Sequence, residues 1–394
     1  MSRKTKVATL ALLLVLLGSY TAYRTMFSNT TAALRHAEAF LFRRMTVSQL
    51  AEQGQYRFFY SSNRRLPADI DPFEDGQLRD RQPELHFGRF DSDVQPTLGL
   101  GMLINPTEWF QNEEIQLKEL TALDGGDFME QLRAQVDESP HRGLLVVVHG
   151  FREAFPSALR KTAFVSHVLD LDAPVLLFDW PGNQGGSLNG YRRARQVADA
   201  SGKELAALLE KLAAEVQPQN LWLLANSLGG QVVVSAFDAL DQSGRLAEAG
   251  FKLEDVILTA PDIDQAKLDA GFREQVAKLA EQLTVYVSSN DRALVVSRLV
   301  NRAPRAGEST LQADQLDETE RVIQLTRADD ELITLVDVTP VNRTRNFHNF
   351  SLETPEFFDD LFLRLTNDVT PHSRPIYKVV TPEGRAYWVL TRGR

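Results

Sequence analysis

The chain has 394 residues, 43% hydrophobic and 24% charged, a composition that is ordinary for a soluble globular protein. Its net charge of −10 argues against nucleic acid or an anionic lipid surface as a partner of the main domain. The sequence has no cysteine, which excludes disulfide bonds, thiolate zinc sites and a cysteine nucleophile. The seven histidines show no metal-binding spacing, so we expect no cofactor and chemistry that is metal-free or uses carboxylates.

The first 27 residues have the pattern of a secretory signal or a membrane anchor. The basic stretch Arg3–Lys6 precedes the apolar run Val7–Leu17, which is short for a membrane-spanning helix of about 20 residues. The small-residue cleavage signal after it is poor, so we favour an uncleaved anchor, with a cleaved signal and a buried or amphipathic helix as alternatives. In the first two cases the body would be exported. Residues 28–55 are expected to be a linker with a helix over Leu34–Leu50.

From residue 56 onward, apolar strands alternate with helical segments. The expected strands are Arg142–Phe151, Ala173–Trp180, Leu221–Ala225, Leu253–Ala260, Leu283–Ser289 and Glu331–Val338, and the expected helices are Ser157–Leu169, Tyr191–Val216 and Thr354–Leu365. Unbroken apolar runs are typical of strands that are buried on both faces. We therefore predict one domain over residues 56–366, an α/β fold with a doubly wound, mostly parallel sheet and helices on both faces. Residues 367–394 alternate about a turn and predict a β-hairpin extension.

The run Ala225-Asn226-Ser227-Leu228-Gly229 matches a G-x-S-x-G nucleophile elbow, with Ala225 in the first glycine position. A serine on a sharp strand-to-helix turn exposes its hydroxyl, and its neighbours must be small because the backbone there is strained. The helix that follows directs N–H groups and a positive dipole end toward a developing oxyanion. The alternative is a glycine-rich turn that carries a bystander serine.

The strand that ends in His149-Gly150-Phe151 is expected to supply the second part of an oxyanion hole. In this kind of fold, one N–H comes from the loop after that strand and one from the residue after the nucleophile. Phe151 and Leu228 are therefore the predicted oxyanion-hole donors. His149 is expected to support the loop rather than to act as the catalytic base.

A serine nucleophile needs an orienting acid, which follows it in the chain, and then a histidine base. Asp291, after the second strand beyond the elbow, is the first choice for the acid, and Asp262 is the runner-up. Either carboxylate could instead be a helix N-cap or a turn residue.

Only His348 and His372 follow Asp291 in the sequence. His348 lies ten residues after the last core strand, so its loop can bring the imidazole over the elbow. His372 lies beyond the next helix in a proline-containing stretch and is the weaker candidate. The imidazole would take the proton of Ser227, while Asp291 fixes its tautomer.

Four residues near the active-site end of the sheet are candidates for a substrate pocket. They are Asp179, Trp180, Tyr191 and Asp262. For each of them, packing within a loop is the alternative interpretation.

Several ordered motifs carry a resemblance to a known family. They are Phe58–Arg64, Phe87-Gly88, Val148–Phe151, Phe178–Gly182, the elbow, Ala260–Asp264, Tyr286–Leu294 and Arg305–Gly307. The chain resembles the α/β-hydrolase superfamily and, more narrowly, the bacterial DUF900 group of α/β hydrolases of unknown function. The resemblance implies a triad of Ser227, Asp291 and His348. Relatives usually carry histidine before the nucleophile, where this chain has Asn226, which implies altered packing or substrate preference.

The resemblance implies hydrolysis of an ester or related acyl bond. We expect a serine hydrolase of carboxylesterase or lipase type that acts through an acyl-enzyme on a small-molecule or lipid acyl substrate. With the N-terminal segment as membrane contact, its expected location is the bacterial cell envelope, anchored in the inner membrane facing the periplasm or exported. An acyltransferase on the same triad and a catalytically silent envelope scaffold are the alternatives, and the Ser–Asp–His order argues against the second.

Overall fold

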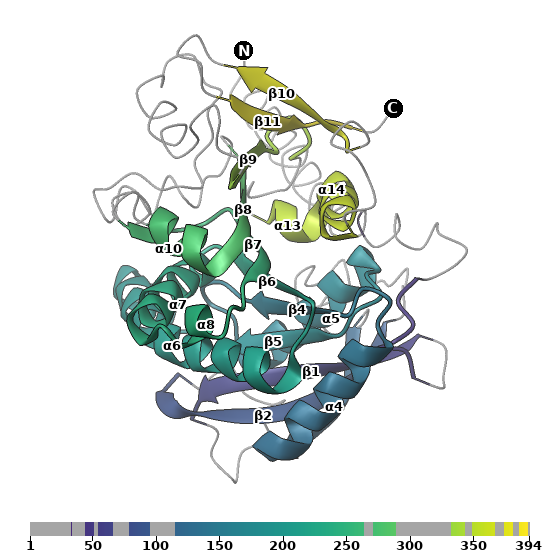
Figure 1. The fold of residues 1–394 in the computed structure, drawn as a ribbon, viewed down its shortest axis with the longest axis vertical. Coiled ribbons are helices and arrows are strands. Elements are labelled where there is room, and N and C mark those ends of the chain that lie inside the picture. The colour runs from purple at the N-terminus through teal and green to yellow at the C-terminus, as the bar shows by residue number, and fades with distance from the viewer. Residues whose placement is uncertain are drawn as a thin grey trace, which may run out of the picture.

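The computed structural model describes residues 44–50, 54–65, 79–94, 115–263, 271–288, 332–342, 349–366, 374–380 and 386–392, together with Ala33. Within these residues, one 11-stranded sheet has the order β10-β11-β9-β8-β7-β6-β4-β5-β1-β2-β3 (Figure 1). The strands are β1 (Gln55–Arg64), β2 (Arg81–Val94), β3 (Ile115–Leu123), β4 (Gly143–Val148), β5 (Val175–Asp179), β6 (Asn220–Asn226), β7 (Leu253–Thr259), β8 (Ala280–Val287), β9 (Ile333–Asp337), β10 (Ile376–Val380) and β11 (Ala386–Leu390).

The centre of the sheet is parallel, as the apolar runs predict. Strands β1, β5, β4, β6, β7, β8, β9 and β11 pair in parallel, while β2, β3 and β10 join antiparallel at the two ends. Every residue of β4 and β5 is buried, which explains why neither strand alternates between apolar and polar residues.

The helices cover both faces of the sheet. They are α4 (Gly125–Glu138), α5 (Phe155–Leu169), α6 (Leu188–Lys211), α7 (Gly229–Ser243), α8 (Arg245–Glu248), α10 (Arg273–Leu279), α13 (Phe350–Glu353) and α14 (Pro355–Thr366), with a π-helical turn η3 (Leu212–Val216) after α6. One core contains Val146 and Val148 with residues of α4, α6, α7 and α10. The other contains Leu145 and Val147 with residues of α5, α13 and α14. Successive residues of β4 thus serve opposite layers, which confirms the doubly wound arrangement.

The predicted C-terminal hairpin is confirmed, and it belongs to the main sheet. Residues Ile376 and Leu390 are opposite each other in the β10–β11 pair, and β11 continues the sheet by pairing in parallel with β9. The hairpin therefore lengthens the core sheet at the edge where β9 would otherwise be exposed (Figure 1).

The predicted N-terminal anchor, residues 1–27, lies outside the described residues. The helix predicted over Leu34–Leu50 is wrong where the structure describes it, because residues 44–50 form a turn with a bridge from Gln49 to Tyr56. The amides of Arg44 and Met45 donate to the Asp170 carboxylate, and those of Thr46 and Val47 donate to Asp172. These carboxylates hold N–H groups that a helix would need. Among the described helices, none is long and apolar enough to span a membrane.

Candidate active site

Ser227 occupies the turn between β6 and α7. Its φ of +53° lies in the left-handed region, which is costly for a residue with a side chain and is typical of functional turns. The Ser227 amide donates to the Thr259 carbonyl (2.9 Å), and the Asp262 amide donates to the Ser227 carbonyl (3.1 Å). The loop after β7 thus clamps both backbone groups of Ser227. The strand–turn–helix predicted for the elbow is present, and Ser227 is 7% exposed.

The loop after β4 lies directly against this turn. A Cβ placed on Gly229 would lie 2.7 Å from the carbonyl oxygens of both Val148 and His149, so only glycine fits there. A Cβ on Gly150 would lie 3.1 Å from the Cβ of Ser227 and 3.7 Å from its Oγ. This close approach explains why both Gly150 in the loop after β4 and Gly229 in the elbow are glycines. It also sets the β4 loop beside the serine hydroxyl.

Two backbone amides belong to the predicted oxyanion hole, those of Phe151 and Leu228. Across the described part of the chain, neither the Phe151 amide nor the Leu228 amide donates a hydrogen bond. Leu228 directly precedes α7, and the Phe151 ring packs edge-on against Tyr191 at 5.4 Å. Unclaimed N–H groups on both sides of a serine are what an oxyanion hole requires.

A fully buried ion pair lies beneath the β4 loop. The Asp179 carboxylate accepts hydrogen bonds from Arg64 Nε (2.8 Å) and Ser62 Oγ (2.6 Å), and it lies 3.0 Å from His149 Nε2. Burial by itself raises the pKa of Asp179, but Arg64 and His149 outweigh burial and lower the pKa below its ordinary value. Asp179 is therefore an ionised carboxylate with three partners.

This network holds the backbone of the loop that carries Phe151. Arg64 Nη2 donates to the carbonyl oxygens of Glu153 (2.8 Å) and Trp180 (2.7 Å). The Trp180 indole donates to the His149 carbonyl (2.8 Å), and the two rings stack at 5.5 Å. His149 Nδ1 lies 2.9 Å from the Gly150 carbonyl oxygen. His149 thus contacts and supports the loop.

Asp179 and Trp180 were expected as pocket residues. Both side chains are fully buried and hold the loop through the contacts above. The sequence analysis placed Arg64 in a family motif but assigned it no role at the site. The available signal was an arginine that ends an apolar strand of a sheet, because a charge placed there needs a buried partner.

Tyr191 and Asp262 lie together beside the elbow. The Tyr191 hydroxyl donates to Asp262 Oδ2 at 2.7 Å, and Asp262 is 4% exposed. Since the Asp262 amide also holds the Ser227 carbonyl, this pair belongs to the immediate surroundings of the serine. Asp291, His348 and His372 lie outside the described residues.

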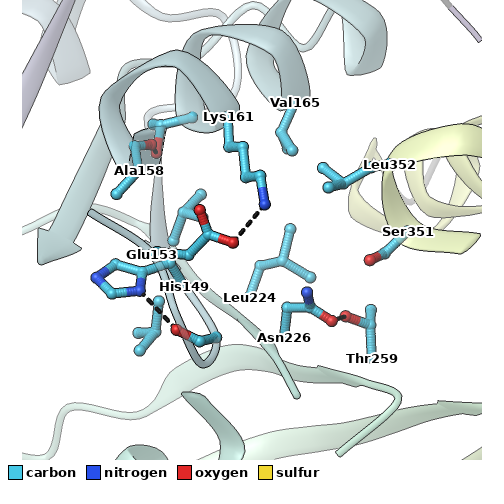
Figure 2. A pocket seen from close by; sticks show the side chains of 14 residues that line it. His149, Glu153, Ala158, Lys161, Val165, Leu224, Asn226, Thr259, Ser351 and Leu352 are labelled. Atoms are coloured by element: carbon cyan, nitrogen blue, oxygen red, sulfur yellow. Dashed lines mark hydrogen bonds and ion pairs between the residues drawn. The ribbon is translucent and has the colours of Figure 1, made fainter. Parts of the chain in front are cut away.

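A small pocket opens on the α5 side of the elbow (Figure 2). Its volume is about 40 Å³, and its walls come from β4, α5, β6, β7 and α13 together with the loop before α5. Glu153 and Lys161 form an ion pair at one end, and Asn226 Oδ1 accepts a hydrogen bond from Thr259 Oγ1 (3.1 Å) at the other. Burial raises the pKa of Glu153, but Lys161 and Ser157 outweigh burial and lower it. Glu153 therefore stays ionised.

The doubly wound sheet, with a serine on a strained turn after its central strand, defines an α/β hydrolase. The chain matches the family described as "Alpha/beta hydrolase of unknown function (DUF900)" over residues 125–361, more than half of its length. It belongs to that family, which supports a hydrolase and leaves the reaction open.

Comparison with solved structures found 29 matching chains. One is a mutant of YbtT, the type II thioesterase from the yersiniabactin NRPS/PKS biosynthetic pathway, at 17% identity and a TM-score of 0.30. The match covers 59% of this chain and 94% of that one. Another is a lipase-esterase related protein from Clostridium acetobutylicum, at 14% identity and a TM-score of 0.23, covering 58% and 90%. The search of curated proteins found no match.

Proposed function

We propose that the protein is a serine hydrolase that cleaves an ester or related acyl bond, with Ser227 as its nucleophile. The observation that carries the proposal is the strained turn of Ser227, together with the nearby amides of Phe151 and Leu228, which have no acceptor among the described residues. A serine hydroxyl next to two N–H donors can attack a carbonyl carbon while the donors stabilise the oxygen that becomes negative.

His348 is the proposed base. Ser351, which lines the pocket next to Asn226, follows His348 by only three residues, a length of chain that spans at most about 11 Å. This short link along the chain to Ser351 supports His348 as the base. His372 follows α14 and has no such tether to the pocket.

Asp291 is the proposed orienting acid. It follows the last residue of β8 by four positions, and β8 is separated from the elbow strand β6 by β7 alone. Parallel strands end at the same edge of a sheet, and this order of strands supports Asp291 as the acid. Asp262 remains the competing acid because its amide already contacts the Ser227 carbonyl.

The proposed reaction runs through an acyl-enzyme. His348 takes the proton of Ser227 while Oγ attacks the carbonyl carbon, and the amides of Phe151 and Leu228 hold the oxyanion. His348 then gives that proton to the leaving alcohol as the ester bond breaks. Water, activated by the same imidazole, attacks the acyl-enzyme and releases the acid.

Labelling with a fluorophosphonate probe tests the proposal. We expect the full-length wild type and Ser243→Ala, whose serine lies at the far end of α7, to be labelled. Ser227→Ala should not be labelled, although its near-ultraviolet circular dichroism should match the wild type. Absence of labelling in folded wild type would contradict an activated serine. A screen of short and long acyl esters then identifies the substrate range.

A further inference from the structure

The pocket beside the elbow contains a side-chain amide, that of Asn226, in which only the oxygen is hydrogen-bonded within the described residues. The oxygen of Asn226 accepts the hydrogen bond from Thr259, which leaves its amide nitrogen turned toward the cavity (Figure 2). Within the described residues, that nitrogen has no acceptor. An amide held by its oxygen is a fixed hydrogen-bond donor for whatever enters the pocket.

Ser351 supplies a second polar group to the same pocket. Its Oγ is buried, has no hydrogen-bond partner in the part of the chain that the structure describes, and turns toward the cavity (Figure 2). The residue is 6% exposed. A buried hydroxyl without a partner is costly, and a bound group that pairs with it removes that cost.

The remaining wall of the pocket sets the charge of the ligand that fits. Lys161 and Glu153 neutralise each other, and Ser157 Oγ also donates to the Glu153 carboxylate (2.6 Å). An anion close to Lys161 would also meet the Glu153 carboxylate, so a neutral polar group is favoured. The other lining residues include Val165, Leu224 and Leu352, which suit a short carbon chain.

The pocket lies next to the elbow, although Ser227 is not itself among its lining residues. Asn226 directly precedes Ser227, and Gly150 both lines the pocket and lies against the Ser227 side chain. A volume of about 40 Å³ holds about three water molecules at roughly 10–15 Å³ each, so only a short group fits.

We propose that this pocket is a specificity subsite for a hydroxyl group carried by the substrate within a few atoms of the scissile carbonyl. The Asn226 amide donates to the substrate hydroxyl oxygen, and that hydroxyl donates to Ser351 Oγ. The proposal rests on the hydrolase function proposed above and specifies its substrate class as hydroxylated esters. The hydroxyl belongs either to the acyl part or to the alcohol part of the ester.

Two matched ester pairs test the subsite. The acyl-side pair is para-nitrophenyl beta-hydroxybutyrate and para-nitrophenyl butyrate, and the alcohol-side pair is glyceryl butyrate and propyl butyrate. We expect kcat/KM to be about tenfold higher for the hydroxylated member of one pair, because a site built around a hydroxyl rejects the analogue that lacks it. The pair that shows the preference identifies the side of the ester that enters the pocket.

Variants assign the preference to the pocket. Ser351→Ala and Asn226→Ala should bring the kcat/KM ratio of that pair toward one. Ser201→Ala is the matched control, since Ser201 on α6 is also buried with an unpartnered hydroxyl among the described residues, and it should keep the ratio. Thermal unfolding checks that each variant folds. A ratio near one in the wild type for both pairs, or an unchanged ratio in Ser351→Ala, overturns the subsite.

A binding measurement separates this proposal from the catalytic one. Calorimetry on Ser227→Ala compares the Kd of each hydroxylated ester with that of its plain partner. Tighter binding of a hydroxylated ester, lost when Ser351→Ala is added, supports the subsite even if the wild type turns nothing over. Equal binding within both pairs overturns it, whatever the outcome of fluorophosphonate labelling.

Discussion

Arg64 and Asp179 form an ion pair 2.8 Å long in which both side chains are fully buried. The pair joins the end of β1 to the end of β5, and the same guanidinium holds the carbonyl oxygens of Glu153 and Trp180. One interaction thus fixes the sheet edge beneath the loop that carries Phe151. The geometry of this loop therefore depends on the Arg64–Asp179 pair, which is shielded from solvent.

Replacing Asp179 by asparagine should destabilise the fold strongly. The change keeps the shape of the side chain but leaves the buried Arg64 charge unpaired, which costs about 3–5 kcal/mol. Urea unfolding measures the loss. Asp91→Asn is the matched control, because Asp91 pairs with Arg57 at 2.7 Å in a partly exposed position, where about 0–1 kcal/mol is expected. Equal losses in the two variants would show that burial of the Arg64 pair has no special effect.

The same pair should make stability depend on pH in acid. The pKa of Asp179 is lower in the folded protein than its ordinary value of 3.8, because Arg64 and His149 outweigh burial. The folded state therefore binds this proton less readily than the unfolded chain, and the stabilisation is complete well above pH 3.8 and is lost as pH falls through the folded pKa. The difference in unfolding free energy between wild type and Asp179→Asn should shrink below that pH. A difference that stays constant down to the acid limit would contradict the assignment.

The choice between the two candidate acids predicts a ranking. Asp291→Asn should lower kcat by roughly ten-thousand-fold if Asp291 orients the base. Asp262→Asn should cost less than about tenfold, because the group of Asp262 that contacts Ser227 is its backbone amide, which asparagine keeps. Steady-state hydrolysis of one ester by both variants gives the comparison, with Tyr191→Phe as the control for the loss of the Asp262 hydrogen bond. The reverse ranking would assign Asp262 as the orienting acid.

The strained backbone of Ser227 should lower the free energy of unfolding. At φ +53°, a side chain costs about 1–2 kcal/mol relative to glycine. The free energy of unfolding of Ser227→Gly should therefore exceed that of Ser227→Ala by about 1 kcal/mol. Both variants should be inactive. Chemical denaturation of the two variants measures the difference. If alanine is as stable as glycine at this position, the turn is not strained.

Much of the fold follows from local pattern. The apolar runs of β4, β5 and β6 predict buried parallel strands because each strand is covered on both faces. The elbow is equally local, because Ala225 and Gly229, two positions on either side of Ser227, are the small residues that the motif requires at a strand-to-helix turn. Helix α6 begins three residues earlier than expected because the Ser187 hydroxyl accepts a hydrogen bond from the Gly190 amide, a cap that apolar spacing does not reveal.

The roles of single polar residues were decided by the tertiary structure. In sequence, Asp179 lies at the end of a buried strand on the active-site edge, as a substrate-binding residue would. Only the parallel register that sets Ser62 opposite Asp179 brings Arg64, 115 residues away, onto the same carboxylate. Likewise, Glu153, Asn226 and Ser351 meet in one pocket although they come from different parts of the chain. Periodicity and turn chemistry act between near neighbours and can be read from the sequence, whereas the partners of a buried polar group depend on which strands lie side by side.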